Sequence, residues 1–138
     1  MEKIDYEAAM EIIPELAEYL PRKTRRRIFL MLYEHFEKRA KKLKESGESK
    51  RPPVIEALAE EIGVNPLTIT YWKGGRFAPT GVSIWGLLEA ALKFEPEKTL
   101  EILREDLERH RELIEMLMGK PQNRERKGWR KLLNFKKP

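Results

Sequence analysis

The sequence predicts an all-α protein. Apolar residues recur three and four positions apart along most of the chain, which is the spacing of one helix face. Glycine and proline residues interrupt this pattern where helices would end or begin. At 138 residues the chain has the length of one domain with an appendage. We expect a helical extension at 1–21, a central domain at 22–94, a long helix at 95–119 and a basic aromatic tail at 120–138.

Residues 4–20 and 22–44 are each predicted to be helical. Asp5 suits an N-cap position, and Pro14 predicts a bend or a division of the first helix. Pro21 separates the two helices. The second helix carries an apolar stripe that is expected to pack on the helices following it, made of Ile28, Leu32, Phe36, Ala40 and Leu43.

Basic residues crowd the start of the second helix with no acid among them: Arg22, Lys23, Arg25, Arg26 and Arg27. Cations at a helix N-terminus oppose the helix dipole, at a cost of roughly 0.3–1 kcal/mol each. Fold stability alone gives no reason for this arrangement. A phosphate partner or an acidic surface such as Glu15 and Glu18 would give one, and a solvated charge run is the alternative.

Residues 53–74 predict two short helices joined by a tight turn. Pro53 suits a first helical turn, and the apolar face that follows contains Ile55, Leu58, Ala59 and Ile62. Gly63 follows directly, where a helix end favours a residue with positive φ. Asn65 is a strong N-cap and Pro66 suits the next position. A connection of only about two residues forces the sharp crossing of a helix-turn-helix pair, whose second helix enters the DNA major groove.

The second of these helices is predicted to bury Ile69 and Trp72, which are three positions apart. Gly74 and Gly75 end it. A loop leads into a further helix at 83–93. Its inward residues are expected to be Ile84, Leu87, Leu88, Ala91 and Leu92.

Residues 54–92 resemble the phage repressor and Cro type (XRE-like, lambda-repressor-like) helix-turn-helix domains. The matching residues are Leu58, Ala59, Gly63, Val64, Asn65, Ile69, Trp72, Gly75, Arg76, Pro79 and the final amphipathic helix. The resemblance implies an all-α domain in which residues 65–74 enter the major groove. It further implies base-edge contacts by Leu67, Thr70 and Tyr71, and contacts to phosphates or to the flanks of the site by Asn65, Thr68, Lys73 and Arg76.

The sequence departs from that family in ways that affect binding. Lys73 stands where the family often has glutamate, which adds attraction to phosphate. Pro66 and Leu67 occupy the base-contacting end, so a thymine methyl contact is available but no bidentate purine contact is. We therefore expect modest specificity, with affinity mainly from phosphate contacts. Lys50 and Arg51 precede the first helix of the pair and are further phosphate candidates.

Residues 95–118 predict one long helix with a coiled-coil seam. The seam residues alternate three and four apart: Leu100, Leu103, Leu107, His110, Ile114 and Leu117. The seam either forms a homodimer or packs within the chain. We favour the homodimer, because helix-turn-helix proteins commonly bind two half-sites. His110 either makes the pairing sensitive to pH or simply lies at the edge of the seam.

The net charge of +5 is concentrated in the tail. Residues 120–138 hold eight basic residues and one acid, so the rest of the chain is slightly acidic. Such a tail suits attraction to a polyanion. It also contains Trp129, Leu132, Leu133 and Phe135, so a DNA-tracking arm, a peptide that docks on a protein partner and a membrane-surface anchor all remain open.

Several classes of function are not predicted. The chain has no cysteine, and His35 and His110 lie far apart in sequence, so neither thiol chemistry nor a metal site is expected. No phosphate-loop motif and no catalytic constellation occur, so we predict neither an enzyme nor a cofactor. Without a membrane span or signal peptide, a cytoplasmic protein is expected. Charged residues at 37% with few amides indicate a thermophilic source.

These observations predict a transcriptional regulator, most simply a repressor, that binds double-stranded DNA as a homodimer. One alternative is a protein-interaction adaptor that uses the C-terminal helix and the tail. Another is a sequence-tolerant accessory protein for replication or segregation of a plasmid or virus.

Overall fold

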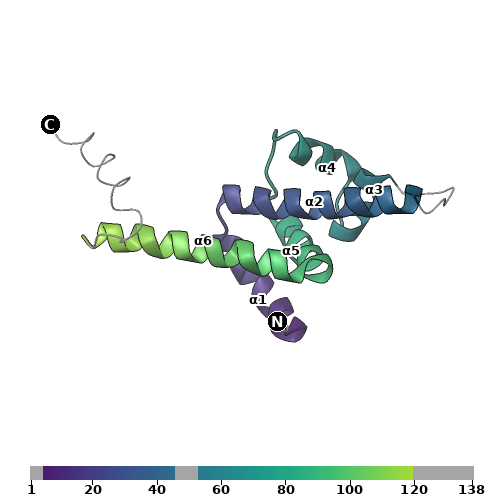
Figure 1. The fold of residues 1–138 in the computed structure, drawn as a ribbon. Helices are drawn as coiled ribbons and strands as arrows, with labels where there is room; N and C mark the ends of the chain where they lie inside the picture. Colours follow the sequence, from purple (N-terminus) through teal and green to yellow (C-terminus); the bar gives the residue numbers. More distant parts are fainter. Residues whose placement is uncertain (1–4, 46–52, 120–138) are drawn as a thin grey trace. The chain divides into compact units, whose positions relative to one another are not determined.

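The computed structural model describes residues 5–45 and 53–119, and over these residues the protein is all-helical (Figure 1). The helices are α1 (Tyr6–Tyr19), α2 (Arg22–Glu45), α3 (Val54–Ile62), α4 (Pro66–Lys73), α5 (Val82–Phe94) and α6 (Pro96–Leu117). The predicted all-α class is confirmed. The chain forms two compact units, residues 1–103 and 104–138, whose boundary lies within α6.

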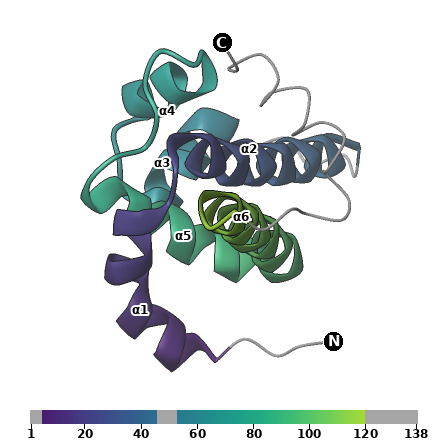
Figure 2. The same cartoon turned by 90° about the vertical axis from the view of Figure 1, so that its left-hand side faces the viewer.

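The first unit is built around α2 and α5. Helix α2 packs against α3, α4 and α5, and α5 also contacts α1 and α3. Helices α1 and α4 lie on opposite sides of α5 in both views (Figure 1, Figure 2). The largest fully buried side chains come from α2 to α6 and include Phe29, Ile28, Leu32, Leu58, Ile69, Leu87, Leu88 and Thr99.

Helix α1 begins at the predicted cap, because the carboxylate of Asp5 accepts a hydrogen bond from the Ala8 amide at 3.1 Å. Pro14 lies inside the helix, which continues to Tyr19. The predicted division at Pro14 is therefore wrong. The buried residues Ile13 and Ala17 on either side of the proline pack into the core, and this burial offsets the backbone hydrogen bond that proline cannot make.

Helix α2 contributes its predicted stripe to the core. Ile28, Leu32 and Phe36 are buried, and the stripe continues with the half-buried Ala40 and Leu43. Phe29 is also fully buried, although it lies outside the stripe. Its ring meets the Trp72 ring edge-on, with centroids 5.4 Å apart. The buried face of α2 is broader than predicted because α4 covers a second side of the helix.

The turn between α3 and α4 has the predicted geometry. Gly63 adopts φ 85°, and the amides of Gly63 and Val64 both donate to the Ala59 carbonyl, at 2.8 and 3.0 Å. The side chain of Asn65 accepts from the Leu67 amide at 2.8 Å and so caps α4. These local features fix where α3 ends and where α4 begins.

Helix α4 ends in a Schellman motif. Gly75 adopts φ 78°, the Arg76 amide donates to the Tyr71 carbonyl at 3.0 Å, and the Gly75 amide donates to the Trp72 carbonyl at 3.1 Å. The prediction that glycine ends this helix is confirmed. Gly75 can adopt the positive φ because it has no side chain.

Helix α5 approaches the end of α3 more closely than a side chain would allow. A Cβ atom on Gly86 would lie 2.0 Å from the Ile62 carbonyl oxygen. Gly86 therefore allows direct contact between the two backbones, a role that no neighbouring residue in the sequence indicates.

Helix α6 is continuous across the boundary between the two units. In the first unit Thr99 and Ile102 are buried, whereas the seam residues Leu100 and Leu103 are half-buried. In the second unit Leu107, His110, Ile114 and Leu117 are exposed. The face of α6 that packs within the first unit is thus centred beside the predicted seam and not on it. Over residues 5–45 and 53–119, no helix is long and apolar enough to cross a membrane.

Candidate nucleic-acid interface

Helix α4 has one buried and one outward side. Ile69 and Trp72 are buried as predicted, whereas Leu67, 54% exposed, and Thr70 are open to solvent. The Thr70 hydroxyl donates back to the Pro66 carbonyl at 3.3 Å, so only its lone pairs remain for an external donor. The outward side of α4 therefore offers an apolar contact and an acceptor.

Tyr71 and Arg76, two of the predicted contact residues, form one cluster with Phe77. The rings of Tyr71 and Phe77 meet edge-on with centroids 5.5 Å apart. The Arg76 guanidinium carbon lies 5.1 Å from the centre of the Tyr71 ring and 5.6 Å from that of Phe77. These cation–π contacts orient the arginine. Phe77, 51% exposed, belongs to the candidate site although we did not predict it.

The other predicted flank residues lie around α4 in different environments. Lys73 is exposed, with its Nζ 4.7 Å from the centre of the Tyr33 ring on α2. Burial, and secondarily the charge of Glu37, raises the pKa of Tyr33, so the ring under the lysine stays neutral. Asn65 uses its carbonyl oxygen for capping, and Thr68 is half-buried. Lys73 is therefore the cation that α4 itself supplies.

Two arginines at the start of α2 have structural partners that the sequence did not reveal. An Nη1–H of Arg26 donates to the Trp72 carbonyl at 2.7 Å, and Arg25 donates through Nη1 to the Pro79 carbonyl. The Arg26 guanidinium also passes 3.4 Å from where a Cβ of Gly75 would lie. These bonds attach the end of α4 and the following loop to α2. They explain part of the basic cluster without a phosphate partner or an acidic surface.

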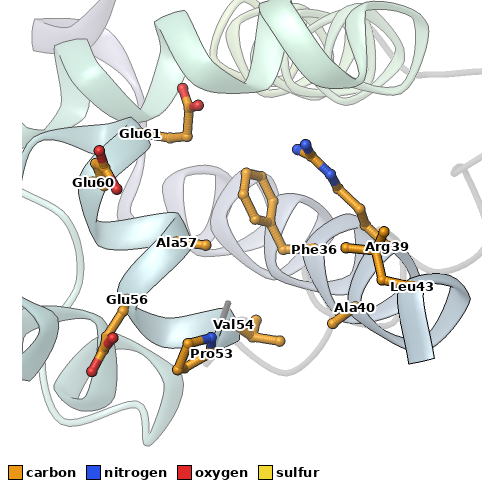
Figure 3. A pocket seen from close by; sticks show the side chains of 10 residues that line it. All are labelled: Phe36, Arg39, Ala40, Leu43, Pro53, Val54, Glu56, Ala57, Glu60 and Glu61. Atoms are coloured by element: carbon orange, nitrogen blue, oxygen red, sulfur yellow. The ribbon is translucent and has the colours of Figure 1, made fainter. Parts of the chain in front are cut away.

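A hollow of about 390 Å³ between α2 and α3 carries the opposite charge, and we call it the acidic hollow (Figure 3). Glu56, Glu60 and Glu61 line it from α3, over apolar side chains that include Phe36. Among the described residues, Arg39 is the one cation that lines it, and that guanidinium lies about 6 Å from the Phe36 and Phe94 rings. Glu61 is paired with Lys93 at 3.5 Å, so the described part of this surface carries mainly the charges of Glu56 and Glu60.

Several predicted residues lie outside the described parts of the chain. These are Lys50, Arg51 and the tail at 120–138. Within the described residues, no group of three or more histidine, cysteine, aspartate or glutamate side chains is placed to hold a metal ion.

No family model, no curated protein and no solved structure matches the chain. The interpretation of α3 and α4 therefore rests on the residues and the geometry described above.

Proposed function

We propose that the protein is a helix-turn-helix DNA-binding regulator of transcription, most simply a repressor, with α4 entering the major groove. The observation that carries this proposal is the α3–α4 pair. A turn at Gly63 joins the two helices, Asn65 caps the second, and Leu67 and Thr70 point away from the core. A short, capped helix presented in this way suits the width of a major groove.

Affinity comes mainly from cations beside α4. Lys73 and Arg76 lie at its C-terminal end, next to the path that a phosphate backbone takes along the groove. Leu67 offers contact with a thymine methyl group, and Thr70 and Tyr71 offer hydrogen bonds that several bases satisfy. Because none of the three proposed base-contacting side chains, Leu67, Thr70 and Tyr71, can form a bidentate purine contact, we expect modest specificity.

The second unit supports a two-fold complex. Leu107, Ile114 and Leu117 follow heptad spacing on α6 and are 68%, 44% and 88% exposed. Self-association through this stripe brings two copies of α4 to one duplex. Sedimentation equilibrium checks it, because Leu107→Glu combined with Ile114→Glu is expected to convert a dimer into a monomer. A wild-type protein that is already monomeric would remove the dimer from the proposal.

Selection of bound sites from a random duplex pool, at about physiological salt, tests the function. A two-fold symmetric motif supports a dimeric regulator. Leu67→Ala and Tyr71→Ala are expected to change the recovered motif, whereas Ile12→Ala is not. Ile12 is matched to Leu67 in exposure, at 53% and 54%, but lies on α1. If the two α4 variants recover the wild-type motif, α4 does not contact the bases.

Two other outcomes point to different functions. Recovery of duplex without any motif indicates a sequence-tolerant accessory protein. Absence of duplex binding contradicts the proposal and leaves the adaptor as the function to pursue. For a DNA-binding protein, the logarithm of affinity falls with the logarithm of salt concentration by about 0.9 per phosphate contact.

A further inference from the structure

A second hollow, of about 530 Å³, lies beside α4. It is formed by the start of α2, one flank of α4, the loop after α4 and the start of α5. The polar residues that line it include Arg22, Arg25, Thr68, Arg76, Thr80 and Ser83. We call it the basic hollow. All its lining residues belong to the first unit.

The wall of the basic hollow holds uncompensated positive charge. It contains Arg22, Arg25 and Arg76 but no carboxylate, and none of these arginines forms an ion pair with a described residue. Arg25 donates through Nη1 to the Pro79 carbonyl, yet its Nε is buried without a hydrogen-bond partner among the described residues. Three guanidinium groups around one hollow repel one another unless an anion joins them.

Backbone amide and hydroxyl groups add further hydrogen-bond donors to the positively charged wall of the basic hollow. Helices α2 and α5 both begin at the hollow, where Arg22 and Ser83 line it, and neither has an acidic residue in its first turn. The free amides of a helix N-terminus carry partial positive charge and favour anions. The hydroxyls of Thr68 and Thr80 supply further donors. Guanidinium, hydroxyl and amide donors together match the oxygens of a phosphate group.

We propose that the basic hollow binds a phosphate group and that Arg22 and Arg25 are its previously unassigned ligands beside Arg76. The phosphate is either a phosphodiester of duplex DNA or a free phosphate. The duplex source rests on the proposed function, because the backbone of a duplex that receives α4 runs along this flank of the helix. Binding of free phosphate does not depend on the proposed function.

The first arm of the test measures duplex affinity across a salt series. Arg22→Gln is expected to weaken binding about tenfold and to reduce the salt slope by about 0.9, the value for one phosphate contact. Lys23→Gln is the matched control, because it removes the same charge from the next position, which is exposed and does not line the hollow. The control is expected to weaken binding less than threefold. The Arg22 side chain makes no hydrogen bond to a described residue, so both variants should fold; circular dichroism checks this.

The second arm measures inorganic phosphate binding to the full chain by nuclear magnetic resonance of the arginine Nε–H groups. A saturable shift that Arg22→Gln abolishes and Lys23→Gln preserves supports a free-phosphate site. If the wild-type protein binds duplex but the two variants behave alike in both arms, the basic hollow is not a phosphate site and the proposed function stands. If duplex does not bind but phosphate does, the site stands and the proposed function fails. If the wild-type protein binds neither duplex nor inorganic phosphate, both the phosphate site and the proposed function are overturned.

Discussion

The acidic hollow and the basic hollow share helix α2 but differ completely in charge. Among the described residues, three glutamates of α3 line the acidic hollow together with one arginine, Arg39, which lies near two aromatic rings. In the basic hollow, three arginines line the wall and no carboxylate does. The same helix supplies walls for both, so the backbone does not cause the difference. The difference comes from the side chains that neighbouring elements add, which are glutamates of α3 in the acidic hollow and Arg76 after α4 in the basic hollow.

Under the proposed function, this contrast orients a bound duplex. The glutamates of α3 disfavour phosphate nearby, whereas the arginines beside α4 and at the start of α2 favour it. The two helices of the pair therefore have unequal roles, although their packing alone would allow either to face a ligand. Specific changes can break or sharpen this contrast.

Gly86→Ala is expected to have the largest effect, because it disrupts the support of both hollows. The added Cβ would lie 2.0 Å from the Ile62 carbonyl oxygen, so α3 or α5 must shift. We expect a loss of about 1–3 kcal/mol in unfolding free energy, measured by urea denaturation. In an uncrowded helix the same substitution usually stabilises by roughly 0.5–1 kcal/mol.

Gly74→Ala is the control for that experiment. Gly74 has ordinary right-handed backbone angles, and a Cβ there would meet its nearest atom at 3.5 Å. We expect a change within about 0.5 kcal/mol. Equal stability of the two variants would show that α3 and α5 are not held in direct backbone contact.

Arg26→Met tests whether the arginines that stabilise the fold differ from those that line the basic hollow. Arg26 donates to the Trp72 carbonyl but does not line the hollow. Its loss is expected to cost about 1.5 kcal/mol of unfolding free energy, measured by thermal and urea denaturation. The salt slope of duplex binding should stay near the wild-type value, and Arg26→Lys should recover part of the stability. A slope change as large as that of Arg22→Gln would contradict this division.

Asn65→Ala and Asn65→Asp distinguish the stability of α4 from its attraction to phosphate. Alanine removes the cap on the Leu67 amide and is expected to cost about 1 kcal/mol. Aspartate retains the cap and favours the helix dipole, so stability should persist. Its added negative charge should nevertheless weaken duplex binding in a fluorescence titration. Unchanged binding by the aspartate variant would place the start of α4 away from the duplex.

Neutralising the acidic hollow is expected to have the smallest effect. Glu56→Gln combined with Glu60→Gln removes two exposed charges that make no ion pair among the described residues. Because salt screens exposed charges beyond about 10 Å at 0.1 M, duplex affinity should rise less than about threefold. Fluorescence titration at that salt concentration measures it. A tenfold rise would mean that the duplex passes over α3, which would reverse the direction argued above.

The ends of the helices were predictable because their signals are local. The caps at Asp5 and Asn65 and the turn at Gly63 involve residues at most five positions apart along the chain. The predicted division at Pro14 was wrong for a related reason. The hydrogen bond that proline cannot make is a local cost, but the burial that offsets it depends on packing against α5. Phe77 escaped notice because its partner Tyr71 contacts it only after the loop has folded back.

The sequence by itself determined that the chain is helical, where most helices begin and end, and which stripes are apolar. Helix periodicity and capping depend on near neighbours, so they can be recognised without a fold. Only the tertiary structure decided that Arg25 and Arg26 hold the end of α4, that Gly86 admits the α3 backbone, and that Arg22 and Arg76 border one hollow. These relations join residues 24 to 54 positions apart, and such distances close only when the core packs.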